Sequence, residues 1–242
     1  YRKKMRKILT LILFAISTSS LADSDDLSTK ASQASKFQGL FLQMGIGYES
    51  IRPTHDSSTL SINGRSTPVT TSSNNVNNMS GMISAGWYQD IAEGYLLGVG
   101  LDYSPFASST GKMSVTTVNS LPGQNNLTND YKYQQKYSYN IFLSPAMTIG
   151  ESGLAYTKVG FTYARVENYN TLKYDFTGYS LGLGYKQIFY DSLFGFAEAN
   201  YADYGNETES ATNPIAVGRT LNSSGTNGLK KANIMVGVGY KF

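Results

Sequence analysis

Residues 233–242 have the sequence NIMVGVGYKF, and the alternation within them is the clearest structural signal in the chain. Five apolar side chains occupy every second position: Ile234, Val236, Val238, Tyr240 and Phe242. The positions between them hold Asn, Met, Gly, Gly and Lys. Because successive side chains of a strand point to opposite faces, this segment predicts a β-strand with one continuous apolar face.

The same two-residue period recurs along the chain. The predicted strands cover residues 40–49, 83–88, 97–104, 136–144, 158–163, 179–186, 197–201 and 233–242. In each of these eight segments one face is apolar, and the other is rich in Gly with a few polar residues. No segment after residue 22 has the 3.6-residue period of an amphipathic helix, so the sequence predicts an all-β fold.

Two all-β architectures can use such strands. A soluble β-sandwich buries the apolar face, whereas a transmembrane barrel turns it toward lipid. The Gly-rich face favours the barrel, because a narrow lumen has to be filled by small and selected polar side chains. Aromatic residues at the ends of the apolar faces favour it too, since they form two girdles at membrane interfaces. One predicted girdle is Tyr48, Tyr103, Tyr137, Tyr163, Tyr179 and Tyr201, and the other is Trp87, Tyr185, Tyr240 and Phe242.

The lengths of the connections between the predicted strands also favour a transmembrane barrel, because short and long connections alternate. Links near residues 89–94, 147–153 and 187–192 are short, whereas 51–78, 105–130 and 203–230 are long and polar. Short periplasmic turns and long external loops are typical of outer-membrane barrels. The predicted fold is therefore all-β, an eight-stranded antiparallel transmembrane β-barrel over residues 39–242, with both of its ends in the periplasm. Asn63-Gly64 suits a tight hairpin turn, which predicts strands that continue past the membrane; the alternative is a disordered polar loop.

The N-terminal segment has the layout of a secretory signal peptide. Met5-Arg6-Lys7 is basic, residues 8–16 form a nine-residue apolar run, and Ser20-Leu21-Ala22 offers a cleavage site. A transmembrane helix needs about 20 apolar residues, twice the length of this run. We therefore predict a signal peptide over residues 1–22, with Met5 as initiator, and a flexible periplasmic leader over residues 23–38.

Composition excludes several classes of function. The chain has no Cys and one His, which excludes disulfide scaffolds, Cys-ligated zinc, iron–sulfur clusters and multi-histidine metal sites. Residues 1–22 hold five of the 20 basic side chains, so the remainder has 15 basic and 17 acidic residues, a net charge of −2. A nucleic-acid partner is therefore not expected. We predict no cofactor and no metal.

Together with the signal peptide, the alternating terminal strand resembles a known family. Ile234, Val236, Val238, Tyr240 and the final Phe242 resemble the C-terminal signal that the barrel-assembly machinery recognises in Gram-negative outer-membrane barrels. The segment GYSLGLGY at residues 178–185 is also typical of them. Over about residues 39–242 the chain resembles the small outer-membrane barrels, which include the OmpA transmembrane domain, OmpX and the Opa-like opacity proteins. The resemblance implies a location in the Gram-negative outer membrane, contact with lipid and lipopolysaccharide, and a monomer.

Seven charged side chains fall on the predicted lumen face: Glu49, Asp102, Lys136, Lys158, Lys186, Glu198 and Lys241. They allow two interpretations, a charged channel or an internal ion-pair network that stabilises a filled barrel. The filled barrel is favoured, because eight strands enclose an interior just wide enough for side chains. The pairing depends on the stagger of the strands, which the sequence does not provide.

Two further residues, Arg165 and His55, are candidate sites. Arg165, near the external end of a strand, is a candidate contact for a lipopolysaccharide phosphate, because Arg binds phosphate bidentately; the alternative is an exposed residue at a loop base. His55, in Thr54-His55-Asp56-Ser57, resembles the loop His of the lipid A palmitoyltransferase PagP. Adjacent loop residues do not form a catalytic triad, and no match to the lipid A deacylase PagL is present, so no catalytic residue and no enzymatic activity are predicted.

The expected function is structural or surface interaction, including adhesion, with long external loops on a rigid barrel contacting host surfaces, other cells, phage or lipopolysaccharide. The alternatives are a small passive outer-membrane channel and, less favoured, an enzyme that modifies lipid A.

Overall fold

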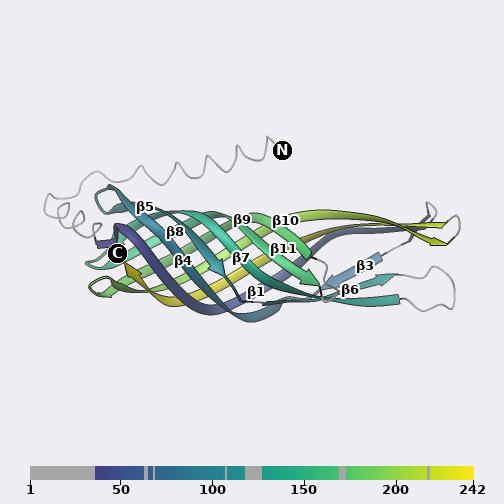
Figure 1. Ribbon diagram of the computed structural model, residues 1–242, viewed down its shortest axis with the longest axis horizontal. Coiled ribbons are helices and arrows are strands. Elements are labelled where there is room, and N and C mark those ends of the chain that lie inside the picture. Colours follow the sequence, from purple (N-terminus) through teal and green to yellow (C-terminus); the bar gives the residue numbers. More distant parts are fainter. Residues whose placement is uncertain are drawn as a thin grey trace.

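The computed structural model describes residues 36–62, 65–67, 69–106, 108–117, 127–168, 173–216 and 219–242. They form an antiparallel barrel with strands that extend well beyond the ring at one end (Figure 1). The predicted signal peptide and the predicted leader up to residue 35 lie outside the described residues. Within the described part of the chain, no helix combines the length and apolar character that a membrane crossing requires.

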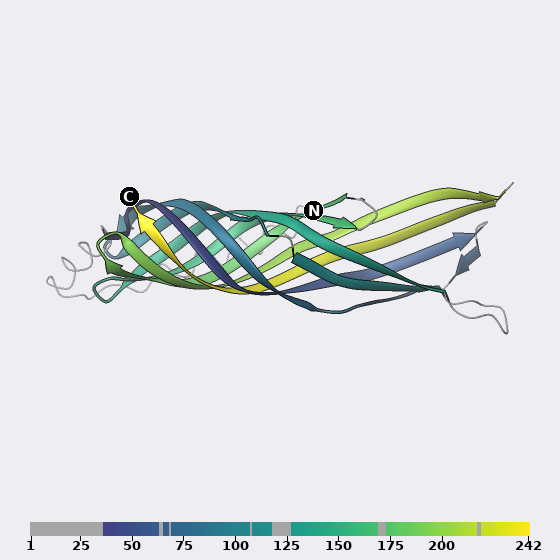
Figure 2. The same cartoon turned by 60° about the horizontal axis from the view of Figure 1, so that its bottom comes forward.

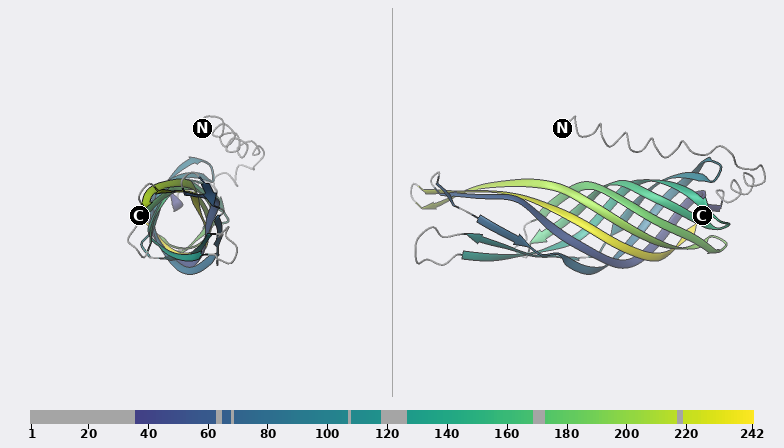
Figure 3. Two further views of the ribbon diagram at one scale, coloured as in Figure 1. Left: turned by 90° about the vertical axis from the view of Figure 1, so that its right-hand side faces the viewer. Right: turned by 180° about the vertical axis from the view of Figure 1, so that it is seen from behind.

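Eight long strands close the ring in the order in which they follow one another, and the last pairs with the first (Figure 3). They are β1 (Gly39–Ile62), β4 (Val76–Ala92), β5 (Tyr95–Ser104), β7 (Leu127–Ile149), β8 (Gly153–Asn168), β9 (Lys173–Tyr190), β10 (Leu193–Ala216) and β11 (Arg219–Lys241). Three further strands, β2 (Arg65–Thr67), β3 (Val69–Ser73) and β6 (Ser108–Thr117), pair outside the ring. The predicted eight-stranded antiparallel barrel is confirmed.

The two faces of the strands separate as the alternation predicts. On β11, Ile234 is 66% exposed and Val236 is 54% exposed, whereas Met235 between them is 1% exposed. The apolar residues of the terminal strand therefore point outward, where a membrane would cover them. Both predicted girdles lie on this outward face, with Tyr48 and Tyr201 toward one end and Trp87 and Tyr240 toward the other.

Glycine on the inward face makes room for aromatic rings from neighbouring strands. A Cβ atom on Gly98 would meet the ring of Tyr88, and one on Gly184 would meet the ring of Tyr156. Gly100 and Phe142 form a similar pair. The lumen is thus filled mainly by aromatic side chains that lie over glycines, an arrangement that single-strand alternation does not reveal.

Tight turns connect the strands at one end of the barrel. Gly94, Gly150 and Asp191 have positive φ angles of 75°, 60° and 43° in these turns. Positive φ is open to Gly at no steric cost and is tolerated by Asp. The C-terminal end lies at the same side, where the Phe242 backbone N–H donates to the Leu40 carbonyl at 2.8 Å. The predicted short links are confirmed and are shorter than expected, because the strands continue into them.

At the other end, the predicted long loops prove to be largely strand (Figure 2). β1, β7, β10 and β11 have 23 or 24 residues each, whereas a strand of about 9–11 residues crosses a membrane. β1 ends at Ile62, which pairs with Arg65 of β2. The predicted hairpin residues Asn63-Gly64, which lie between these paired strands, are outside the described residues. Apart from the Asn63-Gly64 signal, the sequence did not predict these extensions, because polar residues occupy most consecutive positions there and the alternation of hydrophobicity is lost.

Candidate functional site

The centre of the lumen holds a buried ion cluster. Lys158, on β8, places its Nζ 3.1 Å from Asp102 Oδ1 and 2.7 Å from Glu198 Oε2. The three residues come from β8, β5 and β10, so the stagger of the closed barrel brings them together. All three belong to the set predicted from the sequence. The Lys158 and Glu198 side chains are 2% and 0% exposed, so water does not screen this contact.

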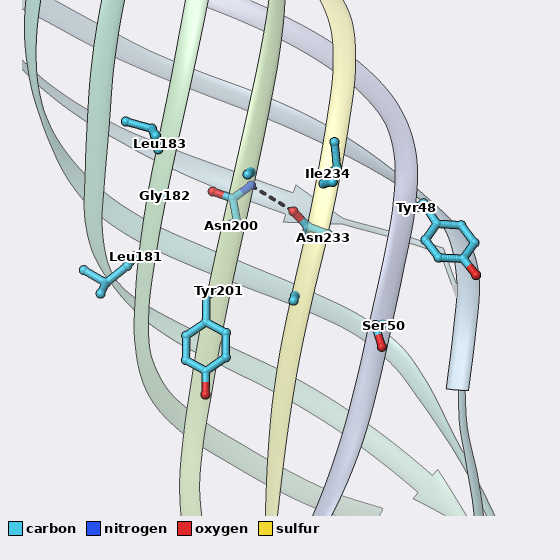
Figure 4. Close-up of a pocket in the computed structure, with 11 residues that line it drawn as sticks. Tyr48, Ser50, Leu181, Gly182, Leu183, Asn200, Tyr201, Asn233 and Ile234 are labelled. Carbon is cyan, nitrogen blue, oxygen red and sulfur yellow. Dashed lines mark hydrogen bonds between the residues drawn. The ribbon is translucent and has the colours of Figure 1, made fainter. Parts of the chain in front are cut away.

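Polar side chains complete the hydrogen bonds of this cluster. Tyr156 donates its hydroxyl to Glu198 Oε2 at 2.7 Å, and Asn200 Nδ2 donates to Glu198 Oε1 at 2.7 Å. Asn140 Nδ2 donates to Asp102 Oδ2 at 3.3 Å. Asn200 also reaches Asn233 Oδ1 at 2.9 Å (Figure 4). Buried charges are tolerated when they are paired and hydrogen-bonded, and this cluster satisfies both conditions.

Lys186 occupies an aromatic cage in place of an ion pair. Its Nζ lies 3.6 Å from the Phe41 ring centroid and 4.9, 5.0 and 5.2 Å from those of Phe194, Tyr88 and Tyr156. Within the described residues no carboxylate lies within ion-pair distance of it. The negative faces of the rings therefore provide the stabilisation that the ammonium lost on leaving water.

Apolar clusters close the lumen on both sides of the ion cluster. The larger one lies toward the tight turns and comprises Phe37, Phe41, Met82, Tyr88, Leu96, Phe142, Ala146, Leu154, Tyr156, Phe194, Phe196 and Met235. The smaller one lies toward the extended end and comprises Ile51, Ala164, Val166, Phe176, Ala202, Tyr204 and Leu229. Side chains therefore fill the barrel at three successive levels.

Phe37 changes the predicted boundary of the leader. It is 4% exposed and packs into the larger cluster, and Lys36 Nζ donates to the Glu151 carbonyl at 2.9 Å. Residues 36–38 were predicted as flexible leader, but in the structure Phe37 is part of the barrel interior. Phe37 precedes the first segment that alternates between apolar and polar residues, so the two-residue period did not predict it as part of a strand or of the interior.

Comparison with known proteins supports the fold. No family model matches the chain, and no curated protein matches it. Among solved structures, the outer membrane protein OprG from Pseudomonas aeruginosa matches with a TM-score of 0.56 and 16% identity, covering 85% of this chain and 96% of that one. The chain therefore has the fold of the small outer-membrane β-barrels. At this identity the likeness establishes the fold alone.

Two other solved barrels align over similar lengths with lower scores. Ail of Yersinia pestis, in complex with the heparin analogue sucrose octasulfate, has a TM-score of 0.45 and 12% identity, covering 85% of this chain and all of that one. Neisserial surface protein A has a TM-score of 0.42 and 11% identity, with the same coverage of both chains.

Glu49 lies in the lumen of the barrel as predicted but is not part of the ion cluster. It is 1% exposed, and neither of its carboxylate oxygens has a hydrogen-bond partner among the described residues. The nearby buried cation is Lys231, whose Nζ donates to Ser138 Oγ at 3.0 Å. Lys231 was not predicted, although extending the alternation of β11 by one more inward position would have found it.

Two other lysines predicted for the lumen, Lys136 and Lys241, are not part of the ion cluster. Lys136 sits at a β-bulge where β7 slips against β8, so it turns toward the rim and pairs with Glu167 at 3.5 Å. A bulge inserts one residue and shifts the inward and outward positions, which a strict period of two does not anticipate. Lys241 is half-buried on the inward face at the tight-turn end, far along β11 from the cluster.

Arg165 has a partner within the chain. Its Nε and Nη2 donate to the two carboxylate oxygens of Asp175 at 2.8 and 2.9 Å. The hydrogen bonds from Arg165, followed by one from Tyr163, hold the pKa of the Asp175 carboxyl below its usual range. The guanidinium fork predicted to bind lipopolysaccharide phosphate is therefore occupied by a cross-strand carboxylate.

His55 lies on β1, where its backbone pairs with Asn227, and was predicted to lie in a loop. Its side chain is outside the described residues. Among the described residues, no three acidic or histidine side chains are grouped so as to hold a metal ion. The residues predicted as assembly signal, from Ile234 to Phe242, all face outward, with Tyr240 and Phe242 packed edge to face at 5.0 Å.

Proposed function

We propose that the protein is a surface-display barrel, in which a filled transmembrane body holds extended hairpins for contact with other surfaces. One observation carries the proposal: the strands continue far outside the ring, while the lumen beneath them is filled by side chains. The backbone that extends into the medium is therefore the part of the molecule available to a partner. Rigid scaffolds that present exposed segments are a common basis of recognition.

The β10–β11 hairpin is the best-described arm. Its strands stay in register from Asn206 paired with Gly228 to Pro214 paired with Thr220, and the register shifts once more before Ala216 pairs with Arg219. Hydroxyl contacts add to the backbone ladder, with Thr208 and Thr226 joined at 2.9 Å and Ser210 and Ser224 at 3.0 Å. Cross-strand Thr and Ser pairs stabilise an antiparallel ladder. The arm thus presents a row of polar groups at fixed spacing.

The experiment shortens this arm and leaves the barrel intact. Residues 207–227 are replaced by Asn-Gly, which suits the two-residue turn that would join Asn206 and Gly228. The matched control replaces the periplasmic turn Asp191-Ser192 by Asn-Gly. Binding of cells that express each variant to host-cell monolayers is compared with that of cells lacking the protein. We expect at least a tenfold loss with the shortened arm and none with the control.

Folding is checked by heat-modifiable gel mobility. If the shortened chain folds and the cells bind as well as wild type, this arm does not carry the contact. If the shortened chain fails to insert, the arm is structural and the proposal is wrong for this hairpin.

The absence of enzymatic activity is part of the proposal, and mass spectrometry of lipid A from cells with and without the protein tests it. A change in acylation would contradict it.

A further inference from the structure

A groove of about 480 Å³ lies on the outer surface of the barrel, across β9, β10, β11 and β1. Large outward side chains form its walls: Tyr48, Leu181, Leu183, Tyr201 and Ile234. Its floor is built of small residues, Gly182, Ala199 and Ala232. The walls are between 44% and 66% exposed, so the groove opens to the surroundings of the barrel and not to its lumen.

A pair of cations lies directly beyond the outer end of this groove. Arg52 on β1 is the cross-strand partner of Lys230 on β11, two positions beyond Ser50 and Ala232 in the groove. Lys230 Nζ is 3.4 Å from Asp203 Oδ2. Arg52 is exposed and makes no hydrogen bond or ion pair with any of the described residues. Two positive charges and one negative charge leave a local excess of +1.

The height of these residues places them at the membrane surface. A strand tilted by about 40° rises roughly 2.5 Å along the barrel axis per residue, which places Arg52 about 30 Å from the level of Leu40. The apolar band of such barrels is about 25 Å tall. The groove therefore lies within the external half of the band, and the cations lie just outside it.

We propose that this face is a binding site for lipid A, with a phosphate on Arg52 and Lys230 and an acyl chain in the groove. The ligand has to be an amphiphile, because an apolar channel and a cation pair adjoin along one line normal to the membrane. It has to be anionic, because the excess charge is positive. In the outer leaflet of a Gram-negative outer membrane, lipid A meets both conditions. The free guanidinium fork of Arg52 suits bidentate contact with phosphate.

The site differs from the one expected from the sequence. Arg165 was the predicted phosphate contact, but it is occupied by Asp175 and lies on β8. Arg52 and Lys230 lie across β1 and β11, and two further strands, β10 and β9, separate β11 from β8 in the ring.

The test measures binding of bisphosphorylated lipid A to the full chain folded in detergent micelles, by native mass spectrometry over a range of lipid concentrations. One variant combines Arg52→Gln with Lys230→Gln, and a second, Ala232→Phe, fills the groove without changing charge. The matched control is Lys136→Gln, which removes a cation near the external rim of β7. Heat-modifiable mobility confirms folding, and Ala199→Phe replaces Ala232→Phe if that variant does not fold.

We expect at least a tenfold weaker apparent affinity for each test variant and less than a twofold change for the control. Dephosphorylated lipid A should bind at least tenfold more weakly than the bisphosphorylated form. Equal losses of lipid A affinity in the control and in the charge variant would overturn the proposal, because the loss would then follow from the removal of any surface cation. Competition by inorganic phosphate as effective as that by lipid A would overturn the role of the groove, as would unchanged binding by the groove-filling variant.

Discussion

Two buried lysines of the lumen are stabilised by different chemistry, and replacement of each should show it. We expect Lys158→Met to lower the free energy of unfolding by about 3–5 kcal/mol, because Asp102 and Glu198 would be left as buried carboxylates without a cation. Lys186→Met should cost less than about 1.5 kcal/mol, since the thioether packs against the same rings and no carboxylate loses its partner. Urea unfolding from lipid vesicles measures both. Similar losses for the two variants would contradict the difference in pairing.

Glu49 should behave in the opposite way to Glu198, although both are buried carboxylates. Glu49→Gln removes a charge that has no partner among the described residues, so stability should stay the same or rise. Glu198→Gln removes an ion pair and weakens two charged hydrogen bonds, and should cost about 1–3 kcal/mol. The same unfolding measurement compares them. A loss for Glu49→Gln as large as that for Glu198→Gln would mean that Glu49 has a partner outside the described residues.

The sequence predicts which of these residues face the lumen, but not which of them pair with one another. Periodicity placed Asp102, Lys158 and Glu198 in the lumen, because each lies on a strand with clear alternation. It could not pair them, because pairing depends on the stagger between strands. It misplaced Lys136 because a bulge shifts the period there. It missed Lys231 because the polar residues before it hide the start of the strand.

At the scale of strands, the pairing of glycines with aromatic rings is a packing rule that can be tested. Gly98 faces Tyr88 across the β4–β5 pair, and the three atoms nearest to a Cβ at position 98 all belong to that ring. Gly98→Ala should cost about 1–3 kcal/mol through overpacking. Tyr88→Leu should also destabilise, since it removes the hydrogen bond to Ser144 and the ring stacked on Phe41.

The double variant should lose less than the sum of the two single losses, because the smaller side chain makes room for the methyl group. A double-mutant cycle of unfolding free energies measures this coupling. Additive losses would mean that the ring does not fill the space over Gly98. The expected coupling is about 0.5–3 kcal/mol, the range for residues in contact.

The extended arms show where strand prediction from sequence reaches its limit. In the barrel, an apolar outer face and a packed lumen impose a strict alternation, so residues 40–49 and 233–242 were predicted closely. In the extensions of β1 and β10, Ser, Thr and Asn occur at consecutive positions, so the sequence there has no period of two. The Asn63-Gly64 dipeptide was the one local sequence signal that predicted an extension there.

For the whole molecule, the two apolar clusters act as barriers in series. A continuous path for ions has to pass the cluster around Phe142 and Phe194, the ion cluster, and then the cluster around Phe176 and Leu229. Each apolar level excludes hydrated ions, because an ion that leaves water without a partner is strongly destabilised. Removing the side chains of one apolar cluster therefore leaves the other cluster as a barrier to ions.

We accordingly expect no single-channel conductance from the folded chain in a planar bilayer. Phe142→Ala with Phe194→Ala should remain silent, and so should Phe176→Ala with Leu229→Ala. The four substitutions together should give discrete current steps, provided that heat-modifiable mobility confirms a folded barrel. Lys158→Met is the control for a change in lumen charge alone, and it should not conduct. Reproducible steps from the wild-type chain would show that the barriers open spontaneously, and a passive channel would then replace surface display as the proposed function.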